Sequence, residues 1–283
     1  MIYLSTGGFH ENTFLEVAEK LDSSVIKGLE LSAGKYTDNL LSDIDKVKKD
    51  YSVALHNYFP VPKEPFVFNL ASCNREVLLK SMQHAKNAIA LSAKYGCPFF
   101  SFHAGYLLDP NVNELGQTIK EKKLIDRDIG LDQFIKNVNE LSVYAKGLNI
   151  ELLIENNVLS QANQQSFKSN PLLMVDSVET EKIFNEVNDN VHLLIDVAHL
   201  KVSANSLGFS AVDYLNRFKS ITRAYHLSDN DGTEDSNKGF DESAWFWKHI
   251  RKDLNYYSIE VYDQNIANLQ HQYQLVSKCL GLK

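Results

Sequence analysis

Four acidic or imidazole side chains occur in this sequence at intervals of about one strand and one helix. Each lies at the end of a short apolar run, and 41, 30 and 34 residues separate one from the next. They are Glu155, Asp196, His226 and Glu260. Three carboxylates and one imidazole make a hard, oxygen-rich ligand set. It suits one divalent metal ion, with Mn²⁺ or Mg²⁺ favoured and Co²⁺ or Zn²⁺ also accepted.

Two of these residues, Glu155 and Glu260, are also of the type that transfers protons. A metal ion that binds a hydroxyl and the neighbouring carbonyl acidifies the carbon between them. Two carboxylates beside that carbon can then remove a proton and return one, by a cis-enediolate route. We therefore expect Glu155 and Glu260 to be catalytic, and Asp196 and His226 chiefly to hold the metal.

Five further side chains, at or just beyond the ends of expected strands, are candidates for substrate contact. They are His56, Tyr58, His103, Asn157 and His199. A histidine in this position can also be a core residue whose hydrogen bonds are satisfied internally. His56 and His103 therefore have a structural interpretation beside the functional one. Tyr58 can likewise be a wall of the pocket or an ordinary core aromatic.

These side chains need a scaffold that brings the ends of many strands together. Short apolar runs alternate along the chain with longer segments of helical spacing. The expected strands are Ile2–Gly8, Lys27–Ser32, Ser52–Phe59, Pro98–Tyr106, Ile150–Asn156, Val191–Leu200, Ala224–Ser228 and Tyr257–Tyr262. The expected helices are Glu11–Leu21, Asn39–Lys49, Asn74–Tyr95, Leu131–Lys146, Ser177–Val187, Ser210–Phe218, Glu242–Lys252 and Asn265–Leu280. A polar loop is expected at Gln161–Asn170.

Eight strand–helix units predict an α/β protein with the (β/α)8 TIM-barrel fold, formed as a single domain over residues 1–283. In this fold the functional groups lie at the C-terminal ends of the strands. The competing architecture is an open, doubly wound sheet. Such a sheet usually has a glycine-rich G-x-G-x-x-G turn after its first strand. The corresponding segment here reads STGGFHENT, which favours the barrel.

The composition is that of an ordinary globular chain with a net charge of −7 and a pI near 5.7. This charge argues against general attraction to nucleic acid. No apolar run approaches the ~20 residues of a membrane helix, and the N-terminus has no pattern of a secretory signal. The three cysteines are odd in number and widely spaced, which is typical of free thiols in a reducing compartment. We therefore expect a cytoplasmic protein with no membrane or nucleic-acid partner.

Four short motifs resemble one known group of barrels. They are IENN at Ile154–Asn157, IDVAH at Ile195–His199, HLSDNDG at His226–Gly232 and IEV at Ile259–Val261. With the order of elements, they resemble the xylose isomerase-like barrel superfamily over nearly the whole chain. That group includes sugar epimerases of the tagatose 3-epimerase type, inosose dehydratase-like proteins and endonuclease IV.

The resemblance implies a metal-dependent isomerase or epimerase that acts on a small sugar or sugar-like carbonyl compound. In the epimerase branch the metal is held by a Glu, Asp, His, Glu set that maps onto Glu155, Asp196, His226 and Glu260. His199 would contact the substrate or a second metal. The resemblance also implies that copies of the chain can associate into homo-oligomers.

Three other functions remain open at this stage. A dehydratase of a sugar or cyclitol ketone would use the same metal and expel water. An endonuclease IV-like phosphoesterase would need a three-metal cluster completed by a D-x-H pair, but the comparable segment is Asp235–Ser236–Asn237. A barrel without catalytic activity would bind a sugar or a partner protein and no metal.

Overall fold

The structure is a computed structural model that describes residues 1–114, 123–167 and 169–282. Eight parallel strands close into a barrel in their sequence order, and β8 pairs with β1 to complete it. The strands are β1 (Ile2–Ser5), β2 (Gly28–Leu31), β3 (Ser52–His56), β4 (Phe99–His103), β5 (Glu151–Glu155), β6 (Val191–Asp196), β7 (Thr222–Leu227) and β8 (Tyr257–Ile259). The prediction of a TIM barrel is therefore confirmed.

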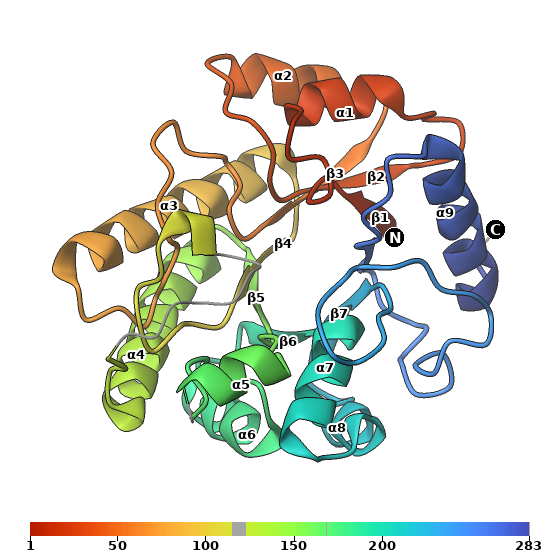
Figure 1. The fold of residues 1–283 in the computed structure, drawn as a ribbon. Helices are drawn as coiled ribbons and strands as arrows, with labels where there is room; N and C mark the ends of the chain where they lie inside the picture. Colours follow the sequence, from red (N-terminus) through yellow and green to blue (C-terminus); the bar gives the residue numbers. More distant parts are fainter. Residues whose placement is uncertain (115–122, 168, 283) are drawn as a thin grey trace.

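Helices surround this barrel on the outside (Figure 1). They are α1 (Phe14–Lys20), α2 (Leu40–Val47), α3 (Arg75–Tyr95), α4 (Arg127–Gly147), α5 (Gln161–Phe167), α6 (Ser177–Glu186), α7 (Val197–Leu207), α8 (Ala211–Arg217) and α9 (Ile266–Leu280), with one 3₁₀ turn at Val112–Glu114. None of the described helices combines the length and apolar character that a membrane span requires.

Side-chain caps mark where several of these helices begin and end. Thr13 and Glu16 form a reciprocal capping box at the start of α1. Asn74 caps α3, whose last turn closes on Gly96 at φ +71°, a conformation that glycine adopts without steric cost. Asp196 caps α7, so this helix begins directly after β6. The same carboxylate thus ends a strand and starts a helix.

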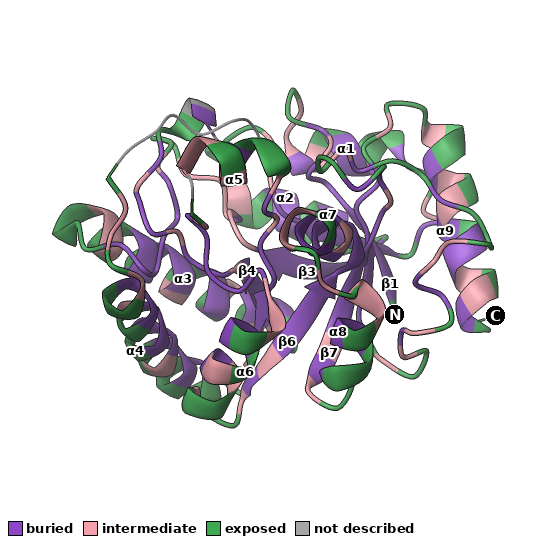
Figure 2. Ribbon diagram, turned by 60° about the horizontal axis from the view of Figure 1, so that its bottom comes forward, coloured by how far each residue is buried: buried purple, intermediate pink, exposed green. Residues whose placement is uncertain are grey.

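The strands are buried on both faces, as their apolar sequences require. Figure 2 shows the barrel as a buried centre, with the exposed residues on the outer faces of the helices. In β6 every residue except His192 is buried. Helices cover the outward-facing side chains of a parallel barrel and neighbouring strands cover the inward-facing ones, so apolar residues are needed at both sets of positions. Charged residues inside this barrel are therefore exceptional.

Three expectations about local structure are wrong. The strand expected over Val191–Leu200 ends at Asp196, and its last four residues belong to α7. The segment Glu242–Lys252 forms a series of turns and no α-helix, because aromatic packing overrides its helical spacing. Phe240 and Trp247 pack with ring centroids 5.7 Å apart, and Trp247 Nε1 donates to the carbonyl of Asp241 (2.9 Å). The expected loop at Gln161–Asn170 contains α5, while residue 168 lies outside the described residues.

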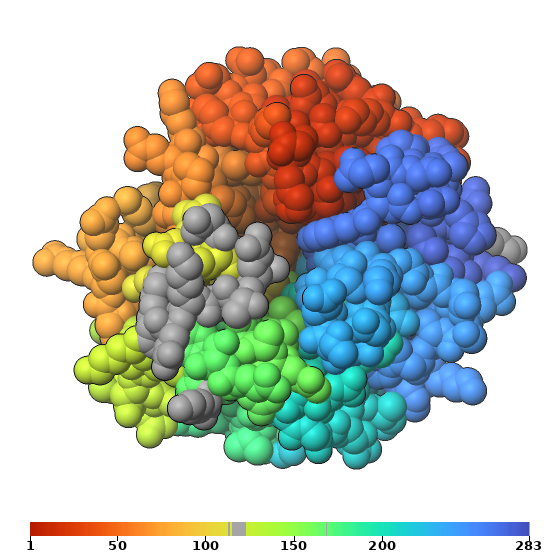
Figure 3. Space-filling view, in the orientation of Figure 1, coloured from red at the N-terminus to blue at the C-terminus, as the bar shows by residue number. Residues whose placement is uncertain are grey.

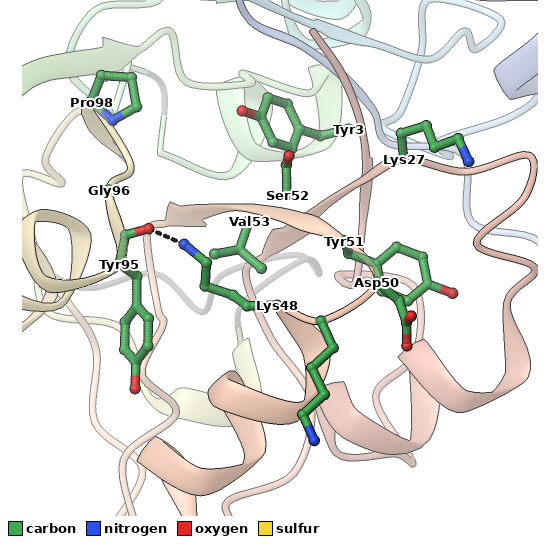
Figure 4. Close-up of a pocket in the computed structure, with 11 residues that line it drawn as sticks. Tyr3, Lys27, Lys48, Asp50, Tyr51, Ser52, Val53, Tyr95, Gly96 and Pro98 are labelled. Carbon is green, nitrogen blue, oxygen red and sulfur yellow. Dashed lines mark hydrogen bonds between the residues drawn. The ribbon is translucent and has the colours of Figure 1, made fainter.

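A hollow of about 470 Å³ lies at the N-terminal end of the barrel, away from the strand ends of interest (Figure 4). Tyr3, Lys27, Lys48 and Ser52 are among the residues that line it. Two of its lysines are engaged by backbone: Lys48 donates to the carbonyl of Tyr95, and Lys27 donates to the carbonyl of Ser23. None of the three candidate metal-binding groups of the described residues includes a side chain that lines this hollow.

Candidate metal centre

The four strand-end residues meet at one point. Glu155 ends β5, Asp196 ends β6, His226 is the penultimate residue of β7, and Glu260 follows β8 directly. Each offers one ligand atom, and these atoms all lie within 4.8 Å of one another. Asp196 and His226 are direct partners in the β6–β7 register, which places them side by side. All four residues are buried.

Several polar atoms of this cluster have no hydrogen-bond partner among the described residues. They are both carboxylate oxygens of Glu155 and Nδ1 of His226. His226 Nδ1 lies 3.4 Å from Glu155 Oε1 and 3.5 Å from Glu260 Oε2. Buried polar atoms are costly when unpaired. Orphaned oxygen and nitrogen atoms that face one another are what a bound cation would satisfy, so these residues fit a divalent metal ion.

Burial and nearby charges shift the pKa values of two carboxyl groups of the cluster in opposite directions. Burial raises the pKa of Asp196 to about 7; His199 acts against this shift, and the negative charges of Glu155, Asp235 and Glu260 add to it. Burial also acts to raise the pKa of Glu155, but the charges of His103 and His226 hold it well below its usual range. The carboxylates around Asp196 therefore repel one another, and a cation at the centre of the cluster would relieve this repulsion.

Histidines from three other places complete the surroundings of Glu155. His56 Nε2, at the end of β3, lies 3.3 Å from Glu155 Oε2, and His103 Nδ1, at the end of β4, lies 3.7 Å from it. His199 Nδ1, in the first turn of α7, lies 3.3 Å from Glu155 Oε1. The ligand atoms of His56, His103 and Glu155 form a second group within 4.8 Å of one another. Glu155 is therefore shared by two groups of candidate metal ligands.

His199 is also tied to the segment that follows β7. Its Nε2 lies 3.1 Å from Asp235 Oδ2, and its Nδ1 lies 3.0 Å from the carbonyl oxygen of Asn156. Asn237 faces Asp235 and, with its amide nitrogen toward the carboxylate, donates to Asp235 Oδ1 at 2.6 Å. Figure 3 shows the segment after β7 in light blue as a raised block on the viewed face. His199 and Asp235 thus anchor this segment to the metal centre.

Two of the expected substrate contacts lie outside the cluster. Asn157 donates through Nδ2 to the carbonyls of Ala104, Gly105 and Leu173, so its amide organises backbone segments. The hydroxyl of Tyr58 accepts a hydrogen bond from the backbone of Phe66, and its ring lies beside Phe66 and His84. Residues next to each other at a strand end point in different directions, so nearness to the cluster in the sequence does not bring a side chain into it.

Sequence reasoning missed several residues that contact the cluster, among them Glu30 in β2. It is fully buried, and its Oε2 accepts from Nε2 of His226 (2.9 Å). Burial acts to raise the pKa of Glu30, but the charge and hydrogen bond of His226 bring it down to about 2. A single glutamate within the apolar run KGLELS was the available signal, because a charge inside a buried strand needs a partner.

The closed barrel and the cluster at its C-terminal strand ends define a TIM barrel with a candidate metal centre. The chain belongs to the xylose isomerase-like TIM barrel family, whose model matches residues 17–270. The resemblance inferred from the motifs is therefore confirmed. The chain matches no curated protein sequence.

Solved structures show the same fold at low sequence identity. A D-tagatose 3-epimerase-like protein is 14% identical, with 98% of each chain covered and a TM-score of 0.70. The D-psicose 3-epimerase of Clostridium cellulolyticum H10, solved with D-tagatose, is 13% identical, with 99% of this chain and 96% of that chain covered and a TM-score of 0.64. The IOLI protein with a zinc atom is 13% identical, with 98% and 95% covered and a TM-score of 0.64.

Proposed function

We propose that this chain is a metal-dependent isomerase or epimerase of a small sugar or sugar-like carbonyl compound. The observation that carries the proposal is the meeting of two glutamates with one aspartate and one histidine at a single point. Glu155 and Glu260 come from strands three steps apart around the barrel, yet their ligand atoms lie within 4.8 Å. Two carboxylates this close to one ligand position suit a reaction that takes up and returns a proton.

Glu155, Asp196, His226 and Glu260 would hold the metal ion in this proposal. Their oxygen-rich set favours Mn²⁺ or Mg²⁺ and also accepts Co²⁺ or Zn²⁺. When bound, the ion would polarise a substrate carbonyl and its neighbouring hydroxyl. The structure of the IOLI protein contains zinc, which supports a divalent metal in this fold without deciding which one this chain takes.

Side chains around the metal centre would position the substrate and transfer its proton. Ser5 donates to Glu260 Oε1 (3.1 Å), which holds that carboxylate in place while its Oε2 faces the cluster. Glu155 and Glu260 would exchange the proton of the substrate carbon. His56 and His103 lie beside Glu155 and would contact substrate hydroxyls. His199, whose ring nitrogens already face Asp235 and the carbonyl of Asn156, would hold the segment after β7 beside the substrate. The small-sugar assignment is supported by the sugar epimerases among the similar structures.

A solvent-exchange assay tests this function. The protein, loaded in turn with Mn²⁺, Mg²⁺, Co²⁺ and Zn²⁺, is incubated in D₂O with a panel of free ketopentoses and ketohexoses. We expect an isomer that carries deuterium at the carbon beside the carbonyl. A product lighter by one water would instead identify a dehydratase. No deuterium uptake from any sugar with any metal would contradict the proposal.

Substitution of Glu260 separates catalysis from folding. Glu260→Gln removes one proton-transferring carboxylate, so the exchange rate should fall by about 10²–10⁴-fold while the protein remains folded. The matched control is Glu19→Gln, an exposed glutamate of α1. A Glu260→Gln protein with the exchange rate of the control would rule out the assigned role.

The second ligand group favours one other candidate function. His56, His103 and Glu155 would hold a second metal beside the first, and paired metals serve phosphoester hydrolysis. The net charge of −7 weighs against a nucleic-acid substrate. Hydrolysis of an abasic DNA duplex together with two or more bound metals per chain would favour this candidate over the isomerase.

A further inference from the structure

A buried chain of polar side chains runs beneath the candidate metal centre. It starts at His226, and its second member is Glu30, whose Oε2 accepts hydrogen bonds from His226 Nε2 (2.9 Å) and from the hydroxyl of Tyr256. The Tyr256 hydroxyl lies 3.4 Å from Ser101 Oγ, and Ser101 Oγ lies 2.9 Å from His56 Nδ1. All five residues are buried. They come from five separate parts of the barrel, so only the folded chain brings them together.

This chain connects the two groups of candidate ligands. His226 belongs to the group of four, and His56 belongs to the group that contains His103. Each imidazole uses one ring nitrogen for the buried chain and turns the other toward Glu155: His226 Nδ1 lies 3.4 Å from Oε1, and His56 Nε2 lies 3.3 Å from Oε2. In both imidazoles, the nitrogen that faces Glu155 is the one that would bind a metal ion.

The direction of every hydrogen bond follows from Glu30. A carboxylate only accepts, so the Tyr256 hydroxyl and His226 Nε2 must both donate to it. With its proton used, the Tyr256 oxygen accepts from Ser101. The Ser101 oxygen then accepts from His56 Nδ1. Both imidazoles therefore carry a proton on the nitrogen that faces the buried chain.

We propose that Glu30 is a positioning residue that sets the ring orientation and tautomer of both His226 and His56 for metal binding. The role rests on the proposed metal-dependent function. Hydrogen bonds from outside the ligand set fix the orientation of metal-binding histidines and raise their basicity. Glu30 acts directly on His226, and it acts on His56 through Tyr256 and Ser101.

One alternative uses the same atoms. Glu30, His56 and His226 also have ligand atoms within 4.8 Å of one another, which is the spacing of a third group of ligands. However, Glu30 Oε2 already accepts two hydrogen bonds, from His226 and Tyr256. Its other oxygen, Oε1, has no hydrogen-bond partner among the described residues, so it is the atom that direct ligation would use. The number of bound metals therefore separates a positioning role from direct ligation.

The test is a measurement of metal affinity and stoichiometry by calorimetry with Mn²⁺ and Zn²⁺, accompanied by the visible spectrum of the Co²⁺-loaded protein. We expect Glu30→Gln to raise the dissociation constant by about 10–100-fold, to shift the Co²⁺ spectrum and to leave the number of bound ions unchanged. Tyr256→Phe keeps the Glu30–His226 bond and interrupts the path to His56. Its effect should therefore be smaller, and greatest on a second equivalent of metal. Glu19→Gln should behave as the wild type.

Three results would overturn the proposal. The first is a metal dissociation constant of Glu30→Gln within twofold of the wild-type value. The second is a Glu30→Gln protein that binds one metal ion fewer than the wild type. The third applies if Glu30→Gln does not fold, and it is a Tyr256→Phe protein that binds every equivalent of metal with wild-type affinity. A wild-type protein that binds metal but converts no sugar would contradict the proposed function alone, and the variants' affinities would still decide the role of Glu30. A wild type that binds no metal would overturn both.

Discussion

Glu155 is the residue on which the contacts of the metal centre converge. Its two oxygens lie within 3.7 Å of nitrogen atoms from four histidines, and neither oxygen has a hydrogen-bond partner in the part of the chain that the structure describes. A carboxylate with no exposure is unfavourable unless positive charge lies close by. The histidines supply part of that charge, and a bound cation would supply the rest. This explains how a fully buried acid is tolerated in the barrel.

Asp196 has two separable roles, one in α7 and one in the metal centre. Its Oδ1 accepts from the backbone N–H of His199 (2.7 Å) as the N-cap. Asp196→Asn keeps a good capping side chain but removes the charge, so it should lose metal affinity without loss of stability in the metal-free protein. Asp196→Ala should be about 1 kcal/mol less stable than Asp196→Asn, because it also lacks the cap. Urea unfolding and calorimetry measure the two effects, and equal stability of the two variants would contradict the capping role.

We expect His84 to make the folded protein less stable as the pH falls. Burial lowers its pKa, although its hydrogen bond to the carbonyl of Asn57 acts in the other direction. The unfolded chain takes up this proton near pH 6.5 and the folded chain only at lower pH, so the unfolded state binds more protons below pH 6.5. The free energy of unfolding should therefore fall as the pH drops below about 6.5.

The measurement is urea unfolding between pH 7.5 and pH 5 in the presence of EDTA. His84→Gln should show a shallower decline than the wild type, whereas His271→Gln, an exposed histidine of α9, should match the wild type. Identical pH profiles for His84→Gln and wild type would show that this histidine does not contribute.

At the level of elements, one arginine joins three segments beside the barrel. Arg127, at the start of α4, pairs with Glu179 of α6 (2.6 Å) and donates to the carbonyls of Asn170 and Leu172. Glu179 is buried and also accepts from the backbone of Met174. The pair therefore fixes the segment between α5 and α6 against both helices.

Removal of the Arg127 side chain should lower the free energy of unfolding. Arg127→Met would leave Glu179 buried with a single hydrogen bond, so we expect a loss of about 1–3 kcal/mol in the free energy of unfolding. Lys182→Met is the matched control, because Lys182 and Asp128 form an exposed pair at 3.7 Å that should contribute less than about 1 kcal/mol. A loss for Arg127→Met no greater than for Lys182→Met would contradict this account.

For the molecule as a whole, the candidate ligands tie half of the barrel together. They come from β5, β6, β7 and the residue after β8, and β8 closes the ring on β1. A ligand that binds only the folded state stabilises it by RT ln(1 + [L]/Kd), or about 2.7 kcal/mol at a hundred times Kd. Metal binding should therefore raise the melting temperature, and EDTA should reverse the rise.

Thermal unfolding with and without Mn²⁺ or Zn²⁺ checks this expectation. The increase should disappear in Glu155→Gln, which lacks the shared ligand, and should persist in Glu19→Gln. A melting temperature of the wild type that is the same with excess metal and with EDTA would count against a metal centre at these strand ends.

The order of the elements and the positions of the four principal site residues were predictable from the sequence. Apolar runs of strand length are easily distinguished from longer helical segments, and a charge at the end of such a run stands out. The segment Glu242–Lys252 was not predictable in this way. Its conformation depends on contacts of Phe240 and Trp247 with each other, and helical spacing does not report such contacts.

By itself, the sequence determined the barrel and placed Glu155, Asp196, His226 and Glu260 at its strand ends, because local spacing and burial are encoded residue by residue. Only the tertiary structure decided which side chains share a space. It brought Glu30 under His226 across 196 residues of chain, and it turned Asn157 toward backbone carbonyls. Side-chain direction and contacts between distant segments arise from closure of the barrel, and no local pattern of residues specifies them.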